Sequence, residues 1–300
     1  MTLLTFRFAP SPNGALHLGH AYSALLNQKL ARRAGGRLLL RIEDIDTARS
    51  TAAFEAGIYH DLEWLDVDWE RPVRRQSEHF ADYRAALDRL VAMGVVYPAF
   101  MSRGEIRAFI ADNGGAKDWP RDPDGAPLYP LADRTLSRRE RERRMAGGAP
   151  FAWRLDVAAA LRHVGKDLFW EEFADETLRA TNRVEARPQD WGDVVVARRD
   201  VPTSYHLAVV ADDALQGVSH VVRGRDLYLA TAVQRLLQEL LGLPAPRYLH
   251  HRLIPGPDGR KLSKSFRDTG LSALREAGAT PDEVAATVGL RPIRAAYEIP

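Results

Sequence analysis

Apolar and polar positions near the N-terminus predict a strand, a helix and a second strand. Residues 3–8 form an almost continuous apolar run, as expected of a short buried strand. Residues 16–30 then carry apolar side chains at helical spacing, and Gly35-Gly36 marks the end of that helix. Residues 37–42 form a second apolar run. A strand, a helix and a strand within about 40 residues indicate a βαβ unit with two parallel strands.

The later pattern extends this unit into a larger α/β domain. Helical periodicity returns at 51–65 and 78–93. Strand-like runs follow at 194–197, 207–211 and 218–222, and a further helix is expected at 227–241. Residues 112–125 are rich in Gly, Pro and Asp, which indicates an insertion. We predict a Rossmann-like, doubly wound parallel sheet with an inserted α/β subdomain and a short helical C-terminal region.

The chain has 300 residues, of which 45% are hydrophobic, so we expect two closely packed units. The predicted bounds are 1–96 and 191–247 for the two halves of the Rossmann-like domain, 97–190 for the insertion, and 248–300 for a loop and short helical region.

Composition excludes some chemistry and leaves other chemistry open. The chain has no cysteine, so a disulfide or a thiolate zinc site cannot form. The formal charge of +2 is too small to indicate a nucleic-acid partner by itself. Five arginines do gather at 138–144, where a solvated helix face is the simpler interpretation. No signal peptide or membrane-spanning run is evident, so we expect a cytoplasmic protein.

Two short strings carry the candidate chemistry. His17-Leu18-Gly19-His20 falls where the first strand gives way to its helix, and the two imidazoles share one helix face. A helix N-terminus attracts phosphate, and the imidazoles could donate hydrogen bonds to a triphosphate, with Gly19 leaving room for a nucleotide. Alone, this string is a weak signal.

The second string strengthens the first. Lys261-Leu262-Ser263-Lys264-Ser265 follows a Gly- and Pro-rich turn about 240 residues later, and Lys261 and Lys264 suit a loop that closes over phosphates. Together the strings predict an ATP site with His17, His20, Lys261 and Lys264 as catalytic residues. Because nothing resembles a covalent nucleophile, we expect catalysis by positioning and electrostatic stabilisation of in-line attack on the α-phosphate.

With these strings in order, the chain resembles the class I aminoacyl-tRNA synthetases, and the glutamyl subgroup in particular. The matching segments are 7–14, 41–46 with Ala48-Arg49, 76–78, 205–208 with Asp212-Asp213, and 217–224. The resemblance runs from about residue 5 to 266, and its motifs are numerous and specific. Under it, residues 97–190 correspond to the family's acceptor-binding subdomain, and the lysine string to its KMSKS-type loop.

The resemblance also implies a pocket for L-glutamate. Arg7, Tyr205 and Arg223 would hold the side-chain carboxylate, for which arginine's planar fork is well suited. Glu43 would hold the α-ammonium group, and Ala9 and Ser11 would line the same site. ATP with Mg²⁺ would be the second substrate, bound by His17, Gly19, His20 and Lys264.

The segment after the lysine string decides between branches of the family. About 33 residues follow it, too few for the helical anticodon-binding region of full glutamyl-tRNA synthetases. The chain therefore resembles the shorter branch, the glutamyl-queuosine tRNA(Asp) synthetases. That resemblance implies a monomer that activates glutamate without tRNA and esterifies queuosine at the wobble position of tRNA(Asp).

One departure from the family concerns zinc. Many relatives place Cys-x-Cys and Tyr-x-x-x-Cys in the insertion, whereas this chain has Ala99 and Met101 at the first pair, and Asp133 after Tyr129. Two such ligands cannot make a tetrahedral structural site, so we predict no zinc. The insertion would then be held by packing, with Phe100, Trp119, Phe151 and Trp153 as candidates.

Three other functions remain open on the sequence. The chain could be a catalytic fragment of a conventional glutamyl-tRNA synthetase that charges the 3′ end. It could be a non-catalytic paralogue that senses glutamate or ATP, although intact His17, His20, Lys261 and Lys264 argue against this. It could be a small nucleotidylyltransferase, which would leave the glutamate-pocket residues unexplained.

Overall fold

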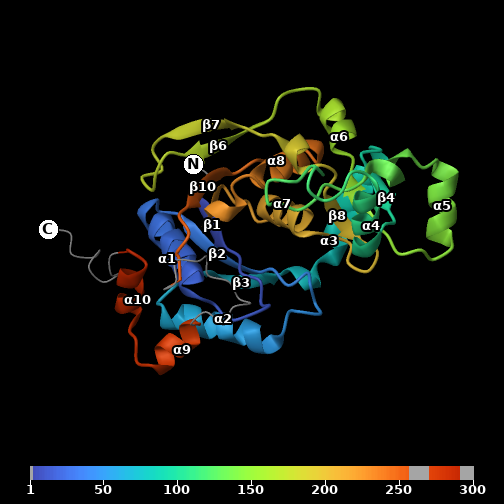
Figure 1. Ribbon diagram of the computed structural model, residues 1–300. Coiled ribbons are helices and arrows are strands. Elements are labelled where there is room, and N and C mark those ends of the chain that lie inside the picture. The colour runs from blue at the N-terminus through green and yellow to red at the C-terminus, as the bar shows by residue number, and fades with distance from the viewer. Residues whose placement is uncertain (1–2, 257–269, 291–300) are drawn as a thin grey trace.

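The computed structural model describes residues 3–256 and 270–290, and every structural statement below concerns these ranges. Two sheets organise them (Figure 1). The strands are β1 Thr5–Phe8, β2 Arg37–Ile42, β3 Glu70–Arg75, β4 Val96–Ala99, β5 Ala152–Leu155, β6 Phe169–Phe173, β7 Thr181–Glu185, β8 Val195–Arg198, β9 His220–Gly224 and β10 Arg247–His251. The α-helices are α1 Leu18–Arg33, α2 Ala52–Trp64, α3 Phe80–Ala92, α4 Arg103–Asp112, α5 Arg138–Ala146, α6 Val157–Val164, α7 Tyr205–Leu215, α8 Thr231–Leu240, α9 Leu271–Glu276 and α10 Pro281–Thr287. Four short 3₁₀ helices among the described residues are η1 Gln76–Glu78, η2 Leu131–Thr135, η3 Pro188–Trp191 and η4 Arg225–Leu227.

The larger sheet has the predicted doubly wound arrangement. Its strand order is β3-β2-β1-β9-β10-β6-β7, in which β7 alone is antiparallel to its neighbour. The chain order reverses between β1 and β9, which pair at Phe6 and His220. Ligands of such sheets bind beyond the carboxyl ends of the strands at this reversal. The fold therefore points to the ends of β1 and β9 as the place for a site.

Alternation along β2 explains how both faces of the sheet are covered. Leu38, Leu40 and Ile42 belong to the core shared with α1 and α2, whereas Leu39 belongs to the core shared with α3, α7 and α8. A strand buried on both faces needs apolar residues at successive positions, as this one has. The prediction of a strand over 37–42 is confirmed.

The smaller sheet, in the order β4-β5-β8, lies at the other end of the molecule (Figure 1). The domain bounds 1–96, 97–190, 191–247 and 248–300 stay a prediction. Each of the two sheets contains strands from more than one of these ranges. Strands β6 and β7, from the predicted insertion, extend the larger sheet, while β8, from the predicted second Rossmann half, belongs to the smaller sheet.

One predicted element is wrong. Residues 207–211 were expected to form a strand, but they lie inside helix α7. The Ser204 side chain accepts a hydrogen bond from the Leu207 amide and so begins the helix. Residues Leu207–Val210 are all buried, so the run has no polar face that could reveal a helical period.

Aromatic pairs and a polar cluster hold the insertion together. Phe151 packs against both Phe100 and Trp153, at ring-centroid distances of 6.0 and 5.6 Å. Tyr129 donates a hydrogen bond to Asp133, which also accepts one from the Phe100 amide at 2.7 Å. Trp119, the remaining candidate, packs against Phe109 at 6.0 Å.

The donors at the family's zinc position do not fit a zinc ion. Ala99 and Met101 supply no strong ligand atoms, and the Tyr129 hydroxyl and Asp133 carboxylate are hydrogen-bonded to each other. Among the described residues no group of three or more His, Cys, Asp or Glu side chains could hold a metal ion. The absence of zinc stays a prediction.

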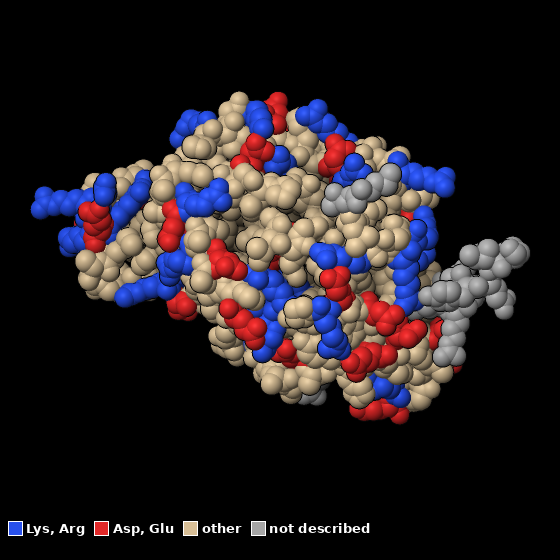
Figure 2. Space-filling view, turned by 180° about the vertical axis from the view of Figure 1, so that it is seen from behind, with Lys and Arg blue, Asp and Glu red and all other residues tan. Residues whose placement is uncertain are grey.

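The arginine-rich segment 138–144 lies within helix α5, none of whose residues is buried. Figure 2 shows basic side chains projecting from this end of the molecule. Three of the five arginines are paired within the helix: Arg138 with Glu142 at 2.8 Å, and both Arg143 and Arg144 with Glu140 at 2.8 Å. These ion pairs agree with a solvated helix face. Within the ranges given above, no helix is long and apolar enough to span a bilayer.

Candidate active site

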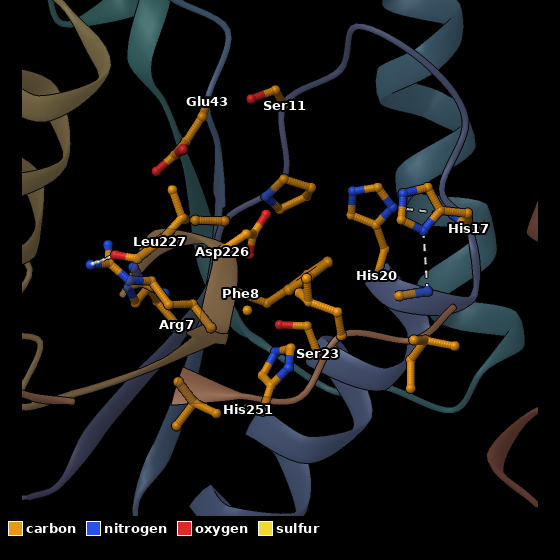
Figure 3. A pocket seen from close by; sticks show the side chains of 18 of the residues that line it. Arg7, Phe8, Ser11, His17, His20, Ser23, Glu43, Asp226, Leu227 and His251 are labelled. Atoms are coloured by element: carbon orange, nitrogen blue, oxygen red, sulfur yellow. Dashed lines mark hydrogen bonds between the residues drawn. The ribbon is translucent and has the colours of Figure 1, made fainter. Parts of the chain in front are cut away.

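A cavity of about 430 Å³ opens beyond the carboxyl ends of β1, β9 and β10 and beside the start of α1. The predicted site residues that the structure describes all line it: Arg7, Ala9, Ser11, His17, Gly19, His20, Glu43, Tyr205 and Arg223. Figure 3 shows His17 and His20 together on one side and Arg7 and Glu43 on the opposite side. The structure thus brings the two predicted half-sites into one cavity.

The histidine side is built into the start of α1. His17 is the N-cap residue, and its Nδ1 accepts a hydrogen bond from the Gly19 amide at 3.1 Å. The Nδ1 atom of His20 accepts one from the His17 amide at 3.2 Å. The two rings lie 3.9 Å apart, centroid to centroid. Because Nδ1 is an acceptor in both rings, each neutral imidazole carries its proton on Nε2, where it can donate to an anion.

Gly19 packs closely against the imidazole ring of His17. A Cβ atom at this position would lie 3.0 Å from Cε1 and 3.1 Å from Nδ1 of His17. The glycine therefore leaves room for the capping imidazole itself. Its predicted role in nucleotide binding stays a prediction.

Lys261 and Lys264 lie outside the described residues. The residues flanking them reach the same site: Ile254 lines the cavity, and Gly270 forms an antiparallel bridge with His17. The Leu271 amide donates to the Leu16 carbonyl at 2.8 Å, which fixes the second flank beside α1.

Charged residues behind the opposite side form a buried charge network of Arg7, Arg41, Glu43, Asp212 and Asp213. Arg41 is fully buried; it donates to Asp213 at 2.7 Å and to Glu43 at 3.0 Å, and it lies 3.8 Å from Asp212. Arg7 pairs with Asp213 at 3.4 Å. Arg7 follows Phe6 and precedes Phe8, whose side chains join the α1 core, so Arg7 points to the face covered by α7.

Burial and pairing compete within this network. Burial raises the pKa of the Glu43 carboxyl, although Arg41 and Arg7 oppose the rise. Burial also acts to raise the pKa of Asp213, but Arg41 and Arg7 outweigh it, so that pKa is lowered. The Asp213 carboxylate is thus stabilised in its charged form by both arginines. The Glu43 carboxylate, at the cavity wall, would be stabilised in its charged form by a further cation.

Arg223 completes this side from the end of β9. It is 5% exposed, and its Nη1 donates to the Tyr205 hydroxyl at 3.4 Å. Arg7, Arg223 and Glu43 together offer two guanidinium groups and one carboxylate. This arrangement complements a ligand with an acidic side chain and an ammonium group.

The reasoning from sequence gave no role to several residues that shape the site. Arg41 and Asp213 lie in segments that match the family, but only the structure shows what they contact. Arg41 is hydrogen-bonded to Glu43, and Asp213 is paired with Arg7. Asp226 lines the cavity beside Gly224, where a Cβ would lie 2.4 Å from the Asp226 Oδ1. No periodic pattern reveals the pairs that Asp213 makes with Arg41 and Arg7, because Asp213 lies 172 and 206 residues away from them in the chain.

Comparison with known proteins agrees with this geometry. Residues 3–296 match the family model described as the catalytic domain of class I tRNA synthetases (E and Q). The chain belongs to this family. It is therefore a ligase of the class I aminoacyl-tRNA synthetases, with activity of the glutamate–tRNA ligase type.

Relatives of two lengths match this synthetase. It is 45% identical to a glutamyl-Q tRNA(Asp) synthetase of Rhodobacter capsulatus, over 95% of this chain and 99% of that protein. It is 38% identical to glutamate–tRNA ligase 2 of Nitrosococcus oceani, over 94% of this chain but 57% of that protein. Among solved structures, the glutamate–tRNA synthetase of Elizabethkingia anophelis superposes with a TM-score of 0.72 at 27% identity, over 94% of this chain and 60% of that one. The methionyl-tRNA synthetase of Mycobacterium tuberculosis, with a TM-score of 0.56 and 15% identity, shares the fold.

Proposed function

We propose that this synthetase activates L-glutamate with ATP and Mg²⁺, without tRNA, and then transfers glutamate to queuosine at the wobble position of tRNA(Asp). The observation that carries the first step is the two-sided cavity, in which Arg7 and Glu43 lie across from the two histidines (Figure 3). Arg223 lines the same cavity. A glutamate held at one side would present its α-carboxylate towards an ATP whose phosphates lie at the other.

The first reaction is an in-line displacement. A carboxylate oxygen of glutamate attacks the α-phosphorus of ATP, the bond to the bridging oxygen breaks, and pyrophosphate leaves with the electron pair. His17 and His20 donate from Nε2 to the phosphates as negative charge grows there. Mg²⁺ would neutralise phosphate charge, and Lys261 and Lys264 would add further positive charge.

The second reaction needs access for an acceptor hydroxyl. A second cavity of about 520 Å³ shares Ser11, Glu43 and Tyr205 with the first. It is also lined by Arg49 and Arg198, both exposed. We place the accepting nucleoside here, where its hydroxyl can attack the glutamyl carbonyl, form the ester and release AMP.

The choice of queuosine rests on the relatives. The R. capsulatus protein of nearly equal aligned length is named for glutamyl-Q tRNA(Asp) synthesis, and a relative from Symbiobacterium thermophilum with the same name is 41% identical. The test is incubation with labelled glutamate, ATP and tRNA with or without queuosine. We expect label on queuosine-containing tRNA(Asp), whereas equal label on queuosine-free tRNA would contradict the proposal.

A second candidate is charging of the tRNA 3′ end, favoured by the glutamate–tRNA ligases that match about 94% of this chain. Periodate treatment and ribonuclease mapping of the labelled nucleotide separate the two products. Glutamate-dependent exchange of pyrophosphate into ATP tests the non-catalytic alternative, because a sensor would not support exchange.

The lysine string gives a sharper test of catalysis. We predict that Lys264→Ala raises the activation barrier by ~2–4 kcal/mol, because a charge on the leaving pyrophosphate is lost. Glutamate binding should change far less. Exchange at a near wild-type rate would contradict the role assigned to Lys264.

A further inference from the structure

Arg223 is held by several protein groups at once. Its Nε donates to Nε2 of His250 at 3.0 Å, and its Nη2 donates to the Thr231 hydroxyl at 2.8 Å and the Leu227 carbonyl at 3.2 Å. The Nη1 end lies by Tyr205 at the cavity wall. The guanidinium is thus anchored through its Nε and Nη2 atoms, and its Nη1 atom is left at the wall of the cavity.

His250 is the anchor at the Nε edge, and its own orientation is fixed. Its Nδ1 lies 2.9 Å from Oε2 of Glu172, and its backbone amide donates to Oε1 of Glu172 at 2.8 Å. The His250 side chain is 1% exposed, and His250 does not line the cavity. These contacts cross three neighbouring strands, from β6 through β10 to β9.

The hydrogen bonds determine the state of the ring. Arg223 has only N–H groups to offer, so Nε2 of His250 must accept, and the proton must lie on Nδ1, which donates to Glu172. A doubly protonated ring would set an N–H against the Arg223 N–H. Burial and the Arg223 charge lower the pKa of His250 against the opposing effect of Glu172, in agreement with a neutral ring.

We propose that His250 is a positioning residue for substrate selection: oriented by Glu172, its neutral imidazole fixes Arg223 so that Nη1 meets the side-chain carboxylate of the amino acid. This inference rests on the proposed activation of glutamate and deepens it. It extends the amino-acid site to Glu172, a residue of the predicted insertion. Without the acceptor, the Arg223 side chain regains rotamer freedom and no longer presents a fixed fork.

Two amide variants of His250 test whether the hydrogen bond that Nε2 accepts from Arg223 matters, or only the space that the side chain fills. The oxygen of glutamine can reach the Nε2 position, whereas asparagine reaches only as far as Nδ1. We expect His250→Asn to raise the KM for glutamate at least about tenfold, as for loss of a hydrogen bond to a charged group. We expect His250→Gln to stay within about threefold of wild type, with KM for ATP unchanged in both variants.

Glu172 has a matched control on the same strand. Glu172→Gln leaves a single acceptor oxygen for the His250 amide, the His250 Nδ1–H and the Trp170 indole N–H, so KM for glutamate should rise. Glu171 is exposed and accepts from the Thr181 hydroxyl, so Glu171→Gln should change neither KM.

The readout is pyrophosphate exchange with glutamate and with glutamine as the amino acid. A fall in the glutamate preference in His250→Asn and Glu172→Gln, with rescue in His250→Gln, supports the inference. Equal kinetics for the two His250 variants, with normal exchange by wild type, overturn it and leave the proposed function standing. If wild type shows no glutamate-dependent exchange, both are overturned.

Discussion

The buried charge network beside the cavity and the polar cluster of the insertion both contain buried carboxylates, but the partners of those carboxylates differ. In the insertion, Asp133 accepts hydrogen bonds from the Tyr129 hydroxyl and the Phe100 amide. Just beyond the insertion, Asp193 accepts them from the Tyr97 hydroxyl and the Val157 amide. Arginine nitrogens lie no closer than 3.9 Å to Asp133 and 3.8 Å to Asp193 in their ion pairs with Arg144 and Arg134. In the charge network, Glu43 and Asp213 are matched by Arg41 and Arg7.

The difference lies in what each arrangement leaves for a ligand. A carboxylate satisfied by a tyrosine hydroxyl and an amide forms a closed set that stabilises the local fold. Arg7 and Glu43 of the charge network, and the adjoining Arg223, line the cavity and keep charge facing it. In this synthetase, buried polar groups that hydrogen-bond one another therefore stabilise the fold, whereas buried charged groups that line the cavity are available to bind a ligand.

The largest effect should come from Arg41→Met. The change removes the cation shared by three buried carboxylates, Glu43, Asp212 and Asp213, and breaking a buried ion pair from one side costs about 3–5 kcal/mol. We expect a clear fall in the urea midpoint of unfolding, together with loss of exchange. A stable variant with normal exchange would show that Arg41 does not hold the network together.

Next comes Arg223→Ala, which removes a cation facing the cavity. We expect glutamate binding to weaken by about 1.5–3 kcal/mol, the range for hydrogen bonds to charged groups, which would be measured as a higher KM for glutamate. Stability should change less than in Arg41→Met, because among the described residues Arg223 is hydrogen-bonded to neutral groups and forms no ion pair with a carboxylate. A change confined to ATP affinity would contradict the assignment.

Tyr129→Phe tests the closed cluster of the insertion. The hydroxyl donates to Asp133 and accepts from the Met101 amide, so its loss should lower stability by about 1–3 kcal/mol. Exchange kinetics of the folded variant should match wild type. A raised KM for glutamate would show that the two regions are coupled.

The smallest effect on stability is expected from Arg143→Gln in α5. Its ion pair with Glu140 is exposed to solvent, so its loss should leave the urea midpoint of unfolding nearly unchanged. If the helix contacts tRNA phosphate, the salt dependence of tRNA binding should fall by about one unit of slope. Arg187→Gln, which also breaks an exposed pair three residues apart, is the control. Equal slopes for both variants would identify α5 as a solvated face alone.

The sequence predicted those parts that depend on local pattern or on matching segments. The strand at Arg37–Ile42 follows from an unbroken apolar run, and the cavity residues follow from segments that resemble a family. The helix over 207–211 was missed because its buried residues have no polar side. The Glu172–His250–Arg223 chain was missed because its members are joined by strand order, which no local pattern contains.

Strand order also affects how this chain is made. The Thr5 amide of β1 donates to the Ser219 hydroxyl, 214 residues further along the chain. At ordinary synthesis rates, that partner leaves the ribosome about 10–40 s after β1 does. During this interval β2 can pair with one edge of β1, while the edge that later pairs with β9 has no partner strand. The nascent N-terminal segment is therefore where a chaperone would be most useful to this protein.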